Sequence, residues 1–138
     1  MKNLVLSLCA GAFVAAFSAC SGGDKSSLPY NEGIHIIPMP QSITVQDGKF
    51  RLSDGMSFGA SSPEAKQIAE FFIDKMKRST GYDFSVSDKG AIDLVLDTSM
   101  DGTKEAYKLD VTPEKVTIAA NAPQGLFYGM QTFLQMLP

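Results

Sequence analysis

Alternating apolar and polar residues predict short strands at four places ahead of a first helix. Ile43 and Val45 are flanked by polar residues, and this period of two is typical of a half-buried strand. The Asp47-Gly48 pair that follows indicates a hairpin, because glycine readily accepts a positive φ angle. The strands are expected over residues 34–37, 42–46, 49–52 and 56–58.

Apolar positions spaced by three and four residues then predict a helix that begins near Pro63 and ends at Gly81. Either Ser61 or Ser62 can cap its start, and proline suits the first turn. Glycine at its end favours a left-handed cap. The apolar stripe consists of Ala65, Ile68, Ala69, Phe72 and Met76.

Four more strands and a second helix complete the pattern. The strands are expected over residues 83–86, 91–96, 107–111 and 115–120, the last two joined as a hairpin through 112–114. The order of strands, helix, strands and helix predicts an α+β fold. In this fold a mostly antiparallel sheet carries two helices packed on one face.

The second helix, expected over residues 123–137 with Asn121 as its cap, has a wide apolar stripe. Gly125 and Gly129 lie one turn apart on the same side. Because glycine inside a helix costs about 1 kcal/mol relative to alanine, this pair predicts close approach of a sheet or another backbone.

Residues 1–33 resemble the leader and tether of a bacterial lipoprotein. Residues 1–19 are expected to form a signal peptide that ends in small residues. Residues 17–20, Phe-Ser-Ala-Cys, resemble a lipobox, which predicts lipidation of Cys20 and a polar tether over 20–33. The expected location is the cell envelope, at the outer membrane or periplasmic face. The alternative is an ordinary signal peptide with an incidental cysteine.

Composition excludes several kinds of function. The chain has 138 residues and a net charge of −3, so it offers no basic face for nucleic acid. Of its two cysteines, Cys9 lies in the expected leader, which leaves no disulfide framework and no cysteine-based zinc site in the mature chain. Residues 34–138 are long enough for one modest core.

No catalytic or metal constellation is evident in the sequence. His35 is the only histidine, so serine and threonine side chains lack a plausible base and no zinc-ligand spacing occurs. Glycoside chemistry requires paired carboxylic acids. The acidic residues near strands belong to no recognisable motif and are interpreted as turn or solvent-facing residues; they are Asp93, Asp97, Glu105 and Asp110. No catalytic residue, metal ligand or cofactor is predicted.

Two stretches resemble the N-terminal accessory domain of glycoside hydrolase family 20. Residues 36–43, Ile-Ile-Pro-Met-Pro-Gln-Ser-Ile, look like its opening strand. Residues 105–111 and 116–120 lead into 125–137, Gly-Leu-Phe-Tyr-Gly-Met-Gln-Thr-Phe-Leu-Gln-Met-Leu, which is similar to the helix that ends this domain. Phe133 and Met136 stand where the family usually has leucine. The resemblance covers residues 34–138.

The resemblance implies a non-catalytic domain of a β-N-acetylhexosaminidase, an enzyme that removes terminal β-linked N-acetylhexosamine from glycans. The catalytic Asp and Glu of the family lie in a barrel downstream of Pro138. This barrel is the partner that the resemblance implies. The surface expected to dock that barrel consists of Gly125, Phe127, Gly129, Met130, Phe133, Leu134 and Leu137.

Two other functions remain open at this point. A stand-alone surface glycan-binding lipoprotein would need a row of exposed aromatic side chains, for which Tyr82, Tyr107 and Tyr128 are the candidates. A purely structural envelope protein would show neither glycan binding nor a downstream barrel.

Overall fold

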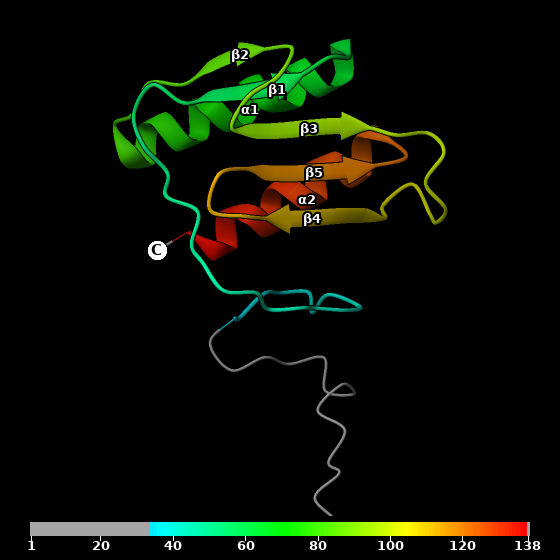
Figure 1. Ribbon diagram of the computed structural model, residues 1–138. Helices are drawn as coiled ribbons and strands as arrows, with labels where there is room; N and C mark the ends of the chain where they lie inside the picture. Colours follow the sequence, from blue (N-terminus) through cyan, green and yellow to red (C-terminus); the bar gives the residue numbers. More distant parts are fainter. Residues whose placement is uncertain (1–33, 138) are drawn as a thin grey trace, which may run out of the picture.

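The computed structural model describes residues 34–137, which form a five-stranded sheet and two helices (Figure 1). The expected signal peptide, the tether and Cys20 lie outside the described residues. Among residues 34–137, no helix is long and apolar enough to cross a membrane.

Along the chain the elements follow the order strand, helix, four strands and helix, and the first of those four is an edge strand of the sheet. The sheet consists of β1 (Ser57–Ala60), β2 (Ser85–Ser87), β3 (Ile92–Leu96), β4 (Tyr107–Val111) and β5 (Val116–Ala120). The helices are α1 (Pro63–Thr80) and α2 (Pro123–Met136). The expected α+β class with two helices is confirmed.

The sheet is mixed rather than mostly antiparallel, which corrects the expectation from sequence. Its strand order is β2-β1-β3-β5-β4. β1 runs parallel to β2 and β3, β3 runs parallel to β5, and only the β4–β5 hairpin is antiparallel. The reason is that α1 carries the chain back between β1 and β2, and a helical crossover brings two strands together in parallel.

The strands expected over 34–37, 42–46 and 49–52 are absent, because this part of the chain adopts irregular structure. Pro38 and Pro40 have no backbone N–H to donate to a ladder. Gly48 does adopt the positive φ expected of a turn, 113°, but it lies against Pro113 in the β4–β5 hairpin instead of joining two paired strands. Phe50 and Leu52 pack against the core.

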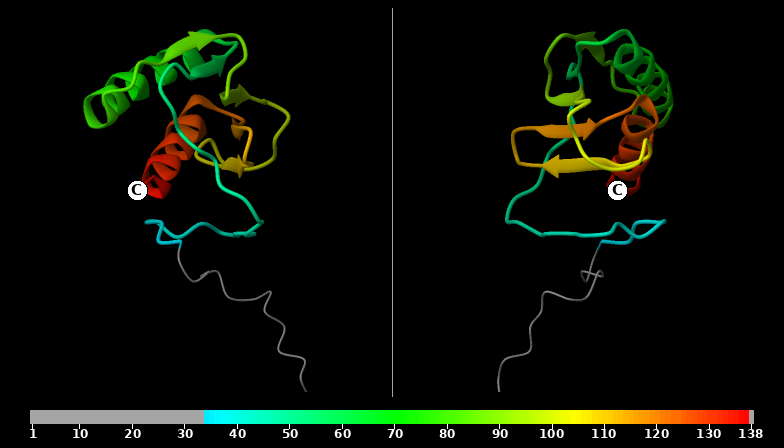
Figure 2. Two further views of the ribbon diagram at one scale, coloured as in Figure 1. Left: turned by 60° about the vertical axis from the view of Figure 1, so that its left-hand side comes forward. Right: turned by 90° about the vertical axis from the view of Figure 1, so that its right-hand side faces the viewer.

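Both helices cover the same face of the sheet (Figure 2). The strand register aligns the inward-facing side chains in rows, and one row runs through Phe58, Ile92 and Val116. These side chains are fully buried. Helix residues that close the core from the other side are Ala65, Ala69, Phe72, Met76, Leu126, Met130 and Phe133.

Local signals at the ends of α1 are confirmed, whereas the expected cap of α2 is wrong. The Ser62 side chain accepts a hydrogen bond from the Ala65 N–H, and Gly81 ends α1 in the left-handed conformation with φ 74°. Ala122, not Asn121, is the N-cap of α2. The Asn121 side chain instead donates to the carbonyl oxygens of Met100 and Gly102, so it supports the loop that leads into β4.

Candidate functional site

Within residues 34–137, the acidic residues singled out in the sequence are either exposed or held in structural hydrogen bonds. Among residues 34–137, no group of three or more His, Cys, Asp or Glu side chains is placed to hold a metal ion. Glu105 and Asp110 are exposed. The pKa of Asp97 is held below its ordinary value, because the Ser99 hydroxyl and then the Ser99 N–H donate to its carboxylate. This is the hydrogen bonding of a turn and does not indicate a reactive group.

Asp93 is the one buried acid among the described residues, and its surroundings are structural. Its Oδ1 accepts from the Gly90 N–H at 2.7 Å, and its Oδ2 lies 2.6 Å from Nζ of Lys115. A Cβ atom at Gly59 would lie only 1.9 Å from Oδ1. The carboxylate therefore holds the loop before β3 against the sheet, which is a structural role.

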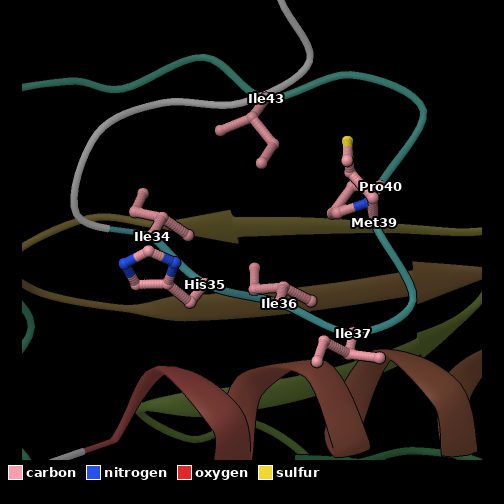
Figure 3. Close-up of a pocket in the computed structure, with 7 residues that line it drawn as sticks. All are labelled: Ile34, His35, Ile36, Ile37, Met39, Pro40 and Ile43. Carbon is pink, nitrogen blue, oxygen red and sulfur yellow. The ribbon is translucent and has the colours of Figure 1, made fainter.

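A shallow hollow near the start of the described chain is lined by a single segment (Figure 3). Its lining residues are Ile34, His35, Ile36, Ile37, Met39, Pro40 and Ile43. Apart from the His35 ring, the side chains that line it are apolar, and no carboxylate is among them. The hollow lacks the paired acids that glycoside hydrolysis requires.

The residues expected to dock a barrel divide into two groups. Gly125, Gly129, Met130 and Phe133 are buried by the domain's own sheet and helices, so they are not available to another module. A Cβ atom at Gly125 would lie 2.3 Å from the carbonyl oxygen of Ala106, which confirms close approach to a backbone. The second group is only partly buried and consists of Phe127, Leu134 and Leu137.

An exposed aromatic strip crosses from α1 to α2. We define the strip as Phe71, Phe127 and Tyr128. The ring centroids of Phe71 and Phe127 lie 5.8 Å apart, and those of Phe127 and Tyr128 lie 6.2 Å apart. The residue surfaces of Phe71 and Tyr128 are 55% and 47% exposed. A contiguous apolar surface of this kind indicates an interaction site.

The three candidate tyrosines do not form a row. Tyr107 turns to the helix side, where its hydroxyl lies 2.6 Å from Oγ1 of Thr132. Tyr82 packs against Phe84 beyond the end of α1. Tyr128 belongs to the aromatic strip. The aromatic surface that does exist includes Phe71, which the sequence analysis did not single out. Its position outside the apolar stripe of its helix was the signal that it would be exposed.

Comparison with known proteins supports the accessory-domain resemblance seen in the sequence. Residues 33–138 match the family model described as glycosyl hydrolase family 20, domain 2. The chain is 31% identical, over its full length, to a β-hexosaminidase of Porphyromonas gingivalis and covers 18% of that protein. It is 26% identical over 83% of its length to a β-hexosaminidase of Vibrio furnissii and covers 19% of it. The chain thus spans less than a fifth of these relatives.

Parts of two solved hexosaminidase structures have a fold similar to that of this chain. An N-acetyl-β-hexosaminidase of Streptomyces plicatus superimposes with a TM-score of 0.71 and 34% identity, over 75% of this chain and 21% of that one. A β-N-acetylhexosaminidase of Bacteroides fragilis gives a TM-score of 0.61 and 25% identity, over 75% and 21%.

Proposed function

Because the chain belongs to glycosyl hydrolase family 20, whose domain 2 it carries over residues 33–138, we propose that it is the non-catalytic accessory part of a β-N-acetylhexosaminidase and supports a separate catalytic barrel. The parent enzyme would remove terminal β-linked N-acetylhexosamine from glycans. The relatives bear the name β-hexosaminidase, and the chain matches only a small part of each.

The aromatic strip is the observation that best supports a docking role. Phe71 on α1 and Tyr128 on α2 expose large aromatic surfaces, and these two helices cover the same face of the sheet (Figure 2). Met136 is also exposed, at 39% of its surface. Covering such side chains with another module would release apolar surface from water, at about 25 cal/mol for each Å² buried. The proposed partner is therefore the barrel, held by the outward-facing residues of α1 and α2.

A domain exchange tests this role directly. The corresponding segment of the Porphyromonas gingivalis β-hexosaminidase is replaced by residues 33–138 of this chain, and turnover of an aryl N-acetyl-β-glucosaminide is measured. We expect the hybrid to be active and the 138-residue chain alone to be inactive. Turnover by the chain alone would refute the proposal. A stable but inactive hybrid that binds glycans through this domain would favour the stand-alone glycan-binding lipoprotein instead.

We also propose that the chain is exported and anchored in the cell envelope through a lipid on Cys20. The support comes from sequence, because residues 17–20 resemble a lipobox and the next residues are polar. Two or more acyl chains would give stable anchoring, since one alone binds a bilayer only marginally. Metabolic labelling with a clickable palmitate analogue should mark the chain, and Cys20→Ala should abolish the label. Equal labelling of that variant would disprove the anchor.

A further inference from the structure

The first described segment is hydrogen-bonded to the side chain of Gln135 in the last turn of α2. We call residues 34–40 the strap. The Ile37 N–H donates to Oε1 of Gln135 at 2.9 Å, and Nε2 of Gln135 donates to the Ile37 carbonyl oxygen at 2.9 Å. The amide of Gln135 thus satisfies both polar groups of one backbone residue, as a neighbouring strand would.

Apolar burial contributes little where the strap meets the helix. Ile37 is 82% exposed and Met39 is 56% exposed. Ile34, Ile36 and Pro40 help to line the hollow of their own segment (Figure 3), and none of them belongs to the residues packed against the core. Pro38 and Pro40 have no N–H to offer. The paired hydrogen bonds from Gln135 are therefore the main specific contact of Ile37 with α2.

We propose that Gln135 is a latch that holds the strap against α2 and so fixes the position of the first residues that the structure describes. In the latched state Ile37 is paired with the glutamine amide. In the released state both groups are hydrated and the strap swings free. The inference concerns the chain itself and stands whether or not the domain docks a barrel.

Amide exchange of the full chain, followed residue by residue by NMR, tests the latch. Gln135→Met keeps the length of the side chain and removes both hydrogen bonds. We expect exchange of the Ile37 amide to accelerate about tenfold, since its protecting bond is lost. Gln124→Met is the matched control, because Gln124 is an exposed glutamine in the same helix. Exchange of the buried Ile118 amide should not change in either variant, which shows that the fold persists.

A second variant separates donor from acceptor. Gln135→Glu keeps an acceptor for the Ile37 N–H but, when ionised, has no donor for the Ile37 carbonyl oxygen. Below the ordinary glutamate pKa of about 4.3 the protonated carboxyl regains a donor. We expect the ionised carboxylate to repel the Ile37 carbonyl oxygen and open the latch, so Ile37 protection should rise toward that of the wild type as the pH falls through about 4.

Two results would overturn the latch. One is an Ile37 amide protected equally in Gln135→Met and in the wild type. The other is Ile37 protection in Gln135→Glu that stays flat across this pH range, relative to the wild type.

Discussion

Gly129 lies so close to Ile118 that a Cβ atom on the glycine would come within 2.4 Å of Cγ2 of the isoleucine. This contact seats α2 directly on β5, in the middle of the helix and near the centre of the sheet. Gly125, one turn earlier, approaches the Ala106 carbonyl oxygen and the Ala120 side chain in the same way. The glycine pair therefore serves the domain's own packing.

Alanine at either glycine should destabilise the domain. Overpacking costs about 1–3 kcal/mol, and better helix propensity returns up to about 1 kcal/mol. We expect Gly129→Ala to lower the free energy of unfolding by about 1–2 kcal/mol. Gly125→Ala should cost more, because the obstructing atom belongs to the backbone and cannot rotate away. Urea denaturation measures both. Gln124→Ala, on the exposed side of α2, is the control; a Gly129→Ala variant as stable as wild type would contradict this packing.

The hydroxyl pair between Tyr107 and Thr132 should contribute measurably to the packing of α2 on β4. Thr132 is buried, so Tyr107→Phe leaves its hydroxyl without this partner. We expect a loss of about 1 kcal/mol in the free energy of unfolding. Adding Thr132→Val should cost little more, because both polar groups are then gone. A double-mutant cycle measures this coupling; additive effects of the two changes would show that the hydroxyls do not interact.

The ion pair between Lys115 and the buried Asp93 should contribute more to the free energy of unfolding than an exposed ion pair does. Lys115→Met leaves the buried Asp93 carboxylate with the Gly90 N–H, which should cost about 1–2 kcal/mol in unfolding free energy. Lys66→Met removes an exposed pair with Asp88, 3.8 Å long, and should cost less than about 0.5 kcal/mol. Thermal denaturation of the two variants compares them. Equal losses would mean that burial of Asp93 has no energetic consequence.

The hydrogen bonds that Ser99 donates to Asp97 predict that a change at Ser99 will alter the Asp97 pKa, which titration can follow. Its pKa is lowered mainly by the Ser99 hydroxyl, which donates to the ionised carboxylate. Ser99→Ala should therefore raise the Asp97 pKa toward its ordinary value. Because a lowered folded-state pKa stabilises above the unfolded value and is lost on acidification, the variant should lose less stability than wild type as the pH falls below about 4. NMR titration of the Asp97 carboxyl carbon checks the shift, with Thr98→Ala as the neighbouring control; an unchanged pKa in Ser99→Ala would contradict the assignment.

The aromatic strip predicts a docking-specific variant of the hybrid enzyme. Tyr128→Lys places a charge on the outward side of α2 and should weaken contact with a barrel while leaving the domain folded. Val95→Lys is the matched control, because Val95 is 38% exposed and lies on the sheet face opposite to the helices. We expect Tyr128→Lys to lower the free energy of unfolding of the hybrid by about 1–3 kcal/mol, as loss of an interface anchor does, and thermal denaturation measures this change. Equal losses from both lysines would argue against docking through this face.

Local signals in the sequence determined the elements whose formation depends on near neighbours. Ser62, Pro63 and Gly81 marked both ends of α1, and the alternation on either side of residues 112–114 marked the β4–β5 hairpin. Helix caps and tight hairpins are encoded within a few residues, so a pattern in one segment is sufficient. The α+β class followed from the same signals and their order, whereas the family resemblance rested on the motifs in residues 36–43 and 105–137.

Only the tertiary structure decided which strands pair and which apolar side chains remain outside. Ile43 and Val45 alternate like a strand, yet no strand among residues 34–137 pairs with them, and a strand without a partner leaves its backbone groups unpaired. The parallel pairing of β1 with β3 joins segments separated by a helix and another strand. Along α2, Met130 and Phe127 look alike in sequence, but the position of the sheet buries the first and leaves the second in the aromatic strip. Pairing and burial depend on where distant segments come to rest, which no local pattern contains.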